Sequence, residues 1–234
     1  MGSNINIKTV PSQAAGAIEV VATIQQGLTD KTLRTLGLAT GSTMLPIYQR
    51  LRALKVDFSE VTSFNLDEYV GIAADDEHGY AHFMQQELFA ALPFKQSFVP
   101  NGMATDLDAE CVRYEGLLQQ AGLDIQLLGV GENGHIAFNE PGTPFDSVTH
   151  VAELTASTQA VNQRFFAPDV AVPTHALTMG IGSILTAKKI ILVAFGERKR
   201  AAMAHLLQGD VTPEWPITKL WHHHDVEVIT DLTF

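Results

Sequence analysis

Short apolar runs alternate with stretches of helical periodicity along most of this chain, and this alternation restricts the possible folds more than any other feature. Apolar runs that predict strands cover residues 32–39, 61–65, 124–130, 176–178, 189–195 and 226–230. Apolar residues at helical spacing predict helices over residues 12–28, 44–55, 79–92, 106–121, 155–166 and 197–208. Strands that alternate with helices imply right-handed crossovers and a sheet covered on both faces. We therefore predict an α/β fold with a three-layer, doubly wound, mainly parallel sheet of Rossmann-like type, in a single domain over residues 1–234.

The bulk composition narrows the class of protein and its partners. The chain has 234 residues, of which 46% are hydrophobic, enough for a sizeable core. The formal net charge of −11 argues against nucleic acid or an anionic membrane as a partner, but it leaves room for a small anionic substrate held by a few local cations. Cys111 is the single cysteine, which fits a reducing cytosol. No apolar run approaches the ~18–20 residues that cross a bilayer, and no signal peptide is recognised, so we expect a cytoplasmic protein.

The candidate active-site loop follows the strand predicted at 124–130 and reads LLGVGENGHIAFNEP over residues 127–141. It matches the G-x-G-x-x-G fingerprint of dinucleotide-binding proteins, but that fingerprint needs a helix at its third glycine. Pro141, Gly142 and Pro144 preclude such a helix, so a loop around a small ligand is the favoured interpretation. His135 and Glu140 supply proton-transfer groups at a strand end, which is where open α/β sheets bind their ligands.

A second polar segment joins the strand at 32–39 to the helix at 44–55. It consists of Thr40, Gly41, Ser42 and Thr43. Amides and hydroxyls at the start of a helix form an anion site, and a plain helix cap by Ser42 or Thr43 explains the segment equally well. No Gly-Lys-Ser/Thr sequence follows, so the segment is not a nucleotide P-loop.

Charged residues follow two more of the predicted strands. Asp67 and Glu68 come directly after the run at 61–65. Neighbouring side chains of an extended segment point to opposite sides, so only one of these carboxylates should face a given pocket; a solvated acidic turn is the alternative. Arg164 and Lys199 stand out in a chain poor in cations, and Lys199 follows the strand at 189–195, hence at the same sheet edge. Ordinary surface charge is the alternative for both.

Histidine pairs and runs invite a metal interpretation that their spacing does not support. His78 and His82 are four residues apart, but neither a His-Glu-x-x-His motif nor a third ligand accompanies them. Three consecutive histidines at 222–224 rarely converge on one ion from a loop. Cys111 lies within a predicted helix, a position typical of packing. We therefore expect no metal site.

Three segments together carry a resemblance to a known family. They are FNLDEYVG at 64–71, GVGENGHIAFNEP at 129–141 and ALTMGIGSIL at 176–185. With them the chain resembles the glucosamine-6-phosphate deaminases, from LGLATGST near residue 36 through the last predicted strand. These enzymes belong to a wider sugar-phosphate isomerase group that includes 6-phosphogluconolactonases, which usually lack the FN-hydrophobe-DEY segment. The resemblance implies conversion of glucosamine 6-phosphate and water to fructose 6-phosphate and ammonia, without a metal or an organic cofactor.

The resemblance also implies roles for individual residues. Asp67 matches the base that moves a proton between C2 and C1 of the open-chain sugar through an enolamine. His135 matches the acid/base that opens the pyranose ring, with Glu140 orienting it and Asn133 beside it. The residues expected to bind the substrate and its phosphate are Thr40, Gly41, Ser42, Thr43, Glu68, Arg164 and Lys199. These residue types suit the implied reaction. Helix amides and cations bind a phosphate dianion, and a carboxylate can take a proton from a carbon next to a carbonyl group.

Three departures from the family pattern bear on regulation and on the catalytic loop. Many members carry Asp where this chain has Asn133, which can orient the imidazole but supplies no negative charge. Its neighbour Glu132 is expected to project elsewhere. Hexameric, allosterically activated members carry basic residues at the positions of His150 and Ala152 and have a C-terminal extension beyond the position of Phe234. We therefore expect an unregulated monomer. A sugar-phosphate lactone hydrolase and a non-catalytic sugar-phosphate sensor remain the alternative functions.

Overall fold

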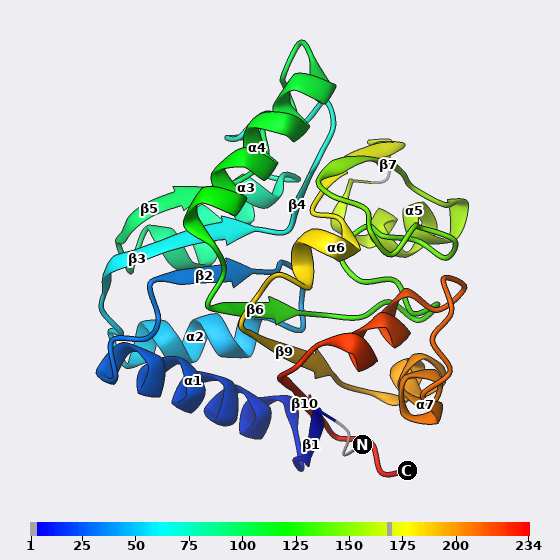
Figure 1. The fold of residues 1–234 in the computed structure, drawn as a ribbon. Helices are drawn as coiled ribbons and strands as arrows, with labels where there is room; N and C mark the ends of the chain where they lie inside the picture. Colours follow the sequence, from blue (N-terminus) through cyan, green and yellow to red (C-terminus); the bar gives the residue numbers. More distant parts are fainter. Residues whose placement is uncertain (1–3, 168–169) are drawn as a thin grey trace.

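A seven-stranded sheet forms the centre of the molecule. The structure is a computed structural model that describes residues 4–167 and 170–234. The sheet has the order β1-β10-β9-β6-β2-β3-β5, and every neighbouring pair is parallel (Figure 1). Its strands are β1 (Ile5–Thr9), β2 (Thr35–Leu38), β3 (Phe58–Asn65), β5 (Phe94–Phe98), β6 (Ile125–Leu128), β9 (Lys189–Ala194) and β10 (Val226–Thr230). All residues of β2 and β6 are buried, as expected for parallel strands covered on both faces.

Helices cover both faces of this sheet. α1 (Gln13–Thr29) and α2 (Leu45–Ala53) contact each other, and Figure 1 shows them on the side of the sheet opposite to α4 (Leu107–Ala121). The connections that contain α1 and α2 run along the sheet toward β5, whereas those that contain α4 and α7 (Arg200–Gln208) run toward β1. Because parallel crossovers are right-handed, the two directions put their helices on opposite faces. The predicted α/β fold with a three-layer, doubly wound, mainly parallel sheet is confirmed.

Several helical segments are less regular than the periodicity indicated. In place of one helix over 79–92, α3 (Tyr80–Met84) passes into a π-helical turn at Gln85–Phe89. The other irregular or short segments are α5 (Ala156–Asn162) with a 3-10 turn at Gln163–Phe165, α6 (Ile181–Ile184), a 3-10 turn at Glu197–Lys199 and a 3-10 helix at Pro216–His222. None of the helices in the described ranges is long and apolar enough to span a membrane.

Two strands of the main sheet were absent from the strand prediction. β1 and β5 lie at the two edges of the sheet, and their middle residues are exposed. An edge strand can keep polar side chains in water, so its sequence lacks the apolar run that marks β2 or β6. Their pairing with β10 and β3 is visible only in the tertiary structure.

A second, three-stranded sheet stands beside the main one. It has the order β4-β8-β7, with antiparallel pairing of β4 (Asp67–Tyr69), β8 (His175–Thr178) and β7 (His150–Glu153). The predicted strand at 176–178 therefore belongs to this sheet and not to the parallel one. Asp67, the second residue after the end of β3, pairs with Thr178 of β8. This pairing fixes the position of Asp67 beside the main sheet.

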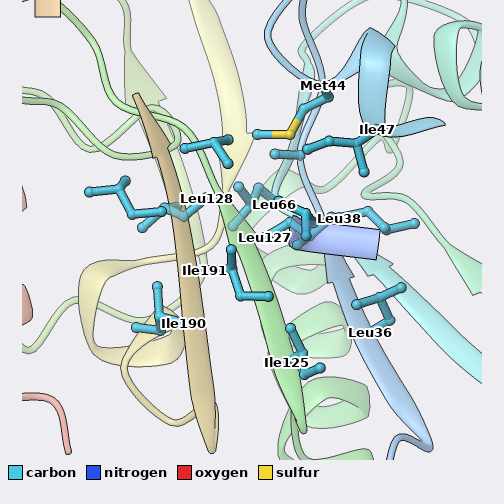
Figure 2. Packing of buried hydrophobic residues seen from close by; sticks show 14 of the residues in the cluster. Leu36, Leu38, Met44, Ile47, Leu66, Ile125, Leu127, Leu128, Ile190 and Ile191 are labelled. Atoms are coloured by element: carbon cyan, nitrogen blue, oxygen red, sulfur yellow. The ribbon is translucent and has the colours of Figure 1, made fainter. Parts of the chain in front are cut away.

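The hydrophobic core fills the space between the main sheet and its helices. Figure 2 shows its part around β2, β6 and β9, where Leu38, Leu66 and Leu127 pack near Met44, the N-cap of α2, and Ile47 in the first turn of α2. Met44 is 1% exposed, so it anchors the start of α2 to the ends of the central strands. The loops that follow these strands are thereby held on a rigid base.

Candidate active site

A cleft of about 450 Å³ opens at the carboxyl ends of β2 and β6. These two strands are neighbours, but the connection after β2 leads toward β5 and the connection after β6 leads toward β1. Such a switch point leaves a crevice between the two departing loops, and ligands of open α/β sheets bind there. The lining includes residues 39–44, 77–80, 129–133 and 157–158 together with Leu66, Asp67, Tyr69, Phe83, His135, Ala137, Phe138, Val161, Asn162, Arg164 and Lys199.

The loop after β6 forms one wall of the cleft and contains no helix over 129–141. The amide of Gly131 donates to the carbonyl of His135 at 2.8 Å, which closes the loop into a tight turn. Gly134 has φ +82, and a Cβ atom there would meet the indole of Trp215 at 2.7 Å, so this position requires glycine. The amide of Ile217 donates to the carbonyl of Gly134 and holds the turn from outside. The glycines thus shape a ligand loop and do not start a crossover helix.

His135 and Glu140 face each other within this loop. Nδ1 of His135 lies 3.7 Å from Oε2 of Glu140, and Asn133 Nδ2 donates to the same oxygen at 2.9 Å. The other oxygen accepts hydrogen bonds from the hydroxyls of Thr158 and, at 3.2 Å, Thr155. Burial raises the pKa of Glu140, but the His135 imidazole and the donors Thr158 and Asn133 outweigh it and lower this pKa to about 2. Glu140 is therefore a fixed negative charge behind the imidazole.

Asp67 and Glu68 point to opposite sides, as predicted for an extended segment. Asp67 lines the cleft, and burial, helped by the charge of Glu68, raises its pKa to about 8. The Glu68 carboxylate accepts the amides of Tyr69, Tyr80 and Ala81 at 2.8 to 2.9 Å and is 2% exposed. It is not among the residues that line the cleft. This geometry does not support the predicted substrate contact by Glu68; the carboxylate instead fastens β4 to the start of α3.

The turn after β2 lies across the cleft from the His135 loop. α2 begins at Leu45 with Met44 as its N-cap, and neither Ser42 nor Thr43 caps it through a side-chain hydrogen bond. The alternative that these hydroxyls only cap the helix is therefore wrong. In the described part of the chain no acceptor is found for the amides of Ser42 and Thr43, and Gly41 takes φ +96 in this turn. Thr40, Gly41, Ser42 and Thr43 all line the cleft with groups suited to an anion.

Two cations also line the cleft. Lys199 is half-buried in the 3-10 turn before α7, and Arg164 lies in the 3-10 turn after α5; both line the cleft. Burial lowers the pKa of Lys199, and the positive charges of Arg164 and Arg198 lower it further, while Glu132 opposes them. The ion-pair partner of Glu132 is Arg198, at 3.6 Å, as expected for a side chain that points away from His135, and Glu132 nevertheless lines the cleft. All predicted site residues except Glu68 and Glu140 contribute to the cleft wall, and Glu140 supports it from behind.

Several residues of the cleft escaped the sequence analysis. Thr158 and Asn162 on α5 contact Glu140 and the Tyr69 hydroxyl, respectively. Single polar residues on a short helix give no signal in one sequence, and only the packing of α5 against the loop reveals them. His78 also lines the cleft, where its ring lies 2.7 Å from the Asp76 carboxylate and stacks on Phe166. Within the described ranges, no three His, Cys, Asp or Glu side chains are grouped so as to hold a metal ion.

Comparison with known proteins identifies the class. The model of the family described as glucosamine-6-phosphate isomerases/6-phosphogluconolactonase matches residues 11–230. The chain belongs to this family.

Particular relatives narrow the similarity further. The chain is 54% identical to the glucosamine-6-phosphate deaminase of Bacillus cereus (strain G9842) over 208 residues, 89% of this chain and 79% of the relative. The deaminase of Bacillus cytotoxicus is 52% identical over 227 residues, 97% of this chain and 87% of that one. A solved monomeric glucosamine-6-phosphate deaminase superposes with a TM-score of 0.92 at 39% identity and covers 96% of both chains. A 6-phosphogluconolactonase from Shewanella baltica has a TM-score of 0.77 at 19% identity, with 98% and 99% coverage, and shares the fold.

Proposed function

We propose that this protein is a glucosamine-6-phosphate deaminase, which converts D-glucosamine 6-phosphate and water to D-fructose 6-phosphate and ammonia. The observation that carries the proposal is that Asp67 and His135, which Glu140 backs, line one cleft together with Arg164 and Lys199. An acid/base for oxygen, a base for carbon and an anion site are the groups that this reaction requires. Deaminases at 52–54% identity support the same activity.

His135 opens the pyranose ring. Its Nδ1 faces Glu140, which leaves Nε2 to take the proton of the C1 hydroxyl and to return a proton to the ring oxygen. Glu140 stays ionised at neutral pH because its pKa is about 2, so it stabilises the imidazolium that forms during the transfer. Asn133 holds the Glu140 oxygen that faces the imidazole. The product of this step is the open-chain aldehyde.

Asp67 then transfers a proton between carbon atoms. Its carboxylate takes the proton from C2, which yields an enolamine, and the same group delivers a proton to C1. The resulting C2 imine is hydrolysed by water to the ketone, and ammonia leaves. A pKa near 8 makes this carboxylate a far stronger base than a solvated aspartate, and a base whose pKa lies near the working pH is the most effective proton-transfer group.

The substrate phosphate occupies the cationic end of the cleft. The amides and hydroxyls of Ser42 and Thr43 donate to its oxygens, and Lys199 and Arg164 balance its charge. Thr40 and Gly41 shape this turn. The half-buried position of Lys199 favours a dianion beside it, because its own charge is incompletely solvated. The phosphate thereby fixes the sugar between Asp67 and His135.

The protein acts as a monomer in the cytoplasm, in amino-sugar catabolism that includes use of N-acetylglucosamine. The support is the similarity to a solved deaminase that is monomeric and the similar length of that chain. Light scattering of the purified protein should give the mass of one chain, 25.4 kDa. The rate should depend hyperbolically on glucosamine 6-phosphate, with or without N-acetylglucosamine 6-phosphate. A hexamer, or a sigmoidal curve straightened by the acetylated sugar, contradicts the proposal.

The decisive experiment measures ammonia and fructose 6-phosphate together. Purified protein incubated with glucosamine 6-phosphate should release both in equal amounts. The same preparation should leave 6-phosphogluconolactone at its spontaneous rate of hydrolysis. Binding of the amino sugar without ammonia release identifies a sensor, and accelerated lactone hydrolysis identifies a lactonase; either result overturns the proposal.

A further inference from the structure

We infer that Glu132 is a built-in counter-ion of the phosphate end of the cleft and weakens the binding of anions there. Glu132 lines the cleft on the same loop as His135 and lies 3.6 Å from Arg198. Its side chain is 48% exposed, so it has room to turn between partners. The inference rests on the phosphate subsite of the proposed function and goes beyond it, because it concerns how tightly that subsite holds an anion.

The charges around Lys199 carry the argument. Lys199, Arg164 and Glu132 line the same cleft, with Arg198 next to Lys199 in sequence. In the absence of an anion, Arg164 and Arg198 disfavour the positive charge of Lys199, whereas Glu132 favours it and lies 3.6 Å from Arg198. A bound phosphate takes over that function. The negative charge of Glu132 then lies close to the negative charge of the phosphate, and the two repel each other.

The effect should fall equally on every anion that uses the subsite. Glu132 acts on a bound phosphate through its charge, beside Lys199 and Arg198, so it should oppose the phosphate of substrate, product and free phosphate alike. An interaction that is the same in the ground state and in the transition state changes KM and leaves kcat unaltered. Glu132 therefore keeps the subsite open to exchange of sugar phosphates and limits its occupation by inorganic phosphate.

The test compares Glu132→Gln with the wild-type enzyme, using inorganic phosphate as probe in calorimetry and as competitive inhibitor. Glutamine keeps the shape of the side chain and removes its charge. The variant should bind phosphate about threefold to tenfold more tightly at low salt, and the difference should shrink as ionic strength rises. KM for glucosamine 6-phosphate should fall by a similar factor at unchanged kcat.

Glu19→Gln is the matched control. Glu19 lies on α1, pairs with Lys8 of β1, and is not among the residues that line the cleft. It should leave phosphate binding unchanged. Equal phosphate affinity in Glu132→Gln and wild type overturns the inference while the deaminase proposal stands. A fall in kcat of the same size as the change in KM also overturns it, because Glu132 would then position the catalytic loop. If neither protein binds phosphate, the phosphate subsite does not exist and the inference fails. Ammonia release tests the deaminase activity separately.

Discussion

The imidazole of His135 lies directly against the Cα atom of Gly131. A Cβ atom built on Gly131 would be 2.2 Å from Cε1 and 2.3 Å from Nδ1 of His135, closer than real atoms approach. The second glycine of GVGENGH therefore makes room for the side chain four residues later. His135 is placed by this contact and by the amide of Gly131, which donates to its carbonyl.

Gly131→Ala should consequently displace the His135 ring. We expect kcat to fall about a hundredfold, since small misplacements of a catalytic group cost that much. The free energy of unfolding should fall by about 1–3 kcal/mol through overpacking. Steady-state kinetics and urea unfolding measure the two effects. Gly116→Ala is the control, because its Cβ would meet no atom within 4 Å; comparable kinetic losses in both variants would contradict the assignment.

His135→Gln should separate ring opening from carbon chemistry. Turnover of the cyclic substrate should fall about a thousandfold, within the range for removal of a general acid/base. The 5-deoxy analogue of glucosamine 6-phosphate cannot form the pyranose ring, so the variant should deaminate it at close to the wild-type rate. Ammonia release from both compounds is the measurement. An equal loss with both would mean that His135 acts in another step.

Thr158→Val should weaken the charge behind the imidazole. The variant removes a hydroxyl that donates to Glu140, so the pKa of Glu140 rises from about 2 and its carboxylate is less firmly held. We expect kcat to fall about tenfold, as for other residues that orient a catalytic group, and stability to fall by about 1–2 kcal/mol. Thr29→Val, on α1, should change neither quantity appreciably. Steady-state kinetics and urea unfolding of both variants test this prediction, and an unchanged kcat in Thr158→Val would contradict it.

Asp67→Asn should abolish turnover and stabilise the fold. The folded-state pKa of Asp67 is about 8 and its unfolded value is 3.8, so the folded protein holds this proton more tightly. Wild-type stability from this group is therefore lost as pH rises from about 4 to 8. The variant should match wild type near pH 4 and exceed it by roughly 5 kcal/mol above pH 8, because each tenfold difference in proton affinity corresponds to ~1.4 kcal/mol. Urea unfolding at both pH values tests this; a variant less stable than wild type at pH 8.5 contradicts it.

The same shift predicts the pH dependence of the reaction. The carboxylate is the active form, so kcat/KM should rise with pH through about 8. Because the substrate also ionises, the direct measurement is a difference titration of wild type against Asp67→Asn without substrate. One additional proton should leave the wild type with a midpoint near pH 8. A midpoint near 4 would show an ordinary solvated carboxylate.

The sequence alone was sufficient for the central strands and the polar loops that follow them. β2, β6 and β9 are buried on both faces, so they need continuous apolar runs that stand out in one sequence. Parallel strands end at one edge of the sheet, so the segments at Thr40, Asp67, His135 and Lys199 could be expected to meet. The opposite orientations of Asp67 and Glu68 followed from the alternation of an extended chain.

Other features depended on contacts between segments far apart in the chain. β1 and β5 gain their structure from pairing at sheet edges and carry polar side chains that no pattern distinguishes from a loop. Glu68 became a backbone acceptor only because α3 starts beside it.

Residue types and their order therefore predicted the chemical groups of the cleft: a carboxylate, an imidazole with its own carboxylate, and a polar turn suited to an anion. Tertiary packing decided how strongly each group acts. Burial raises the pKa of Asp67, and the His135 imidazole together with the Thr158 hydroxyl lowers the pKa of Glu140 and keeps it ionised. The approach of Glu132 to Lys199 partly offsets the effect of Arg164 and Arg198 on its pKa. Solvation and distance govern these electrostatic effects, and both are properties of the folded chain.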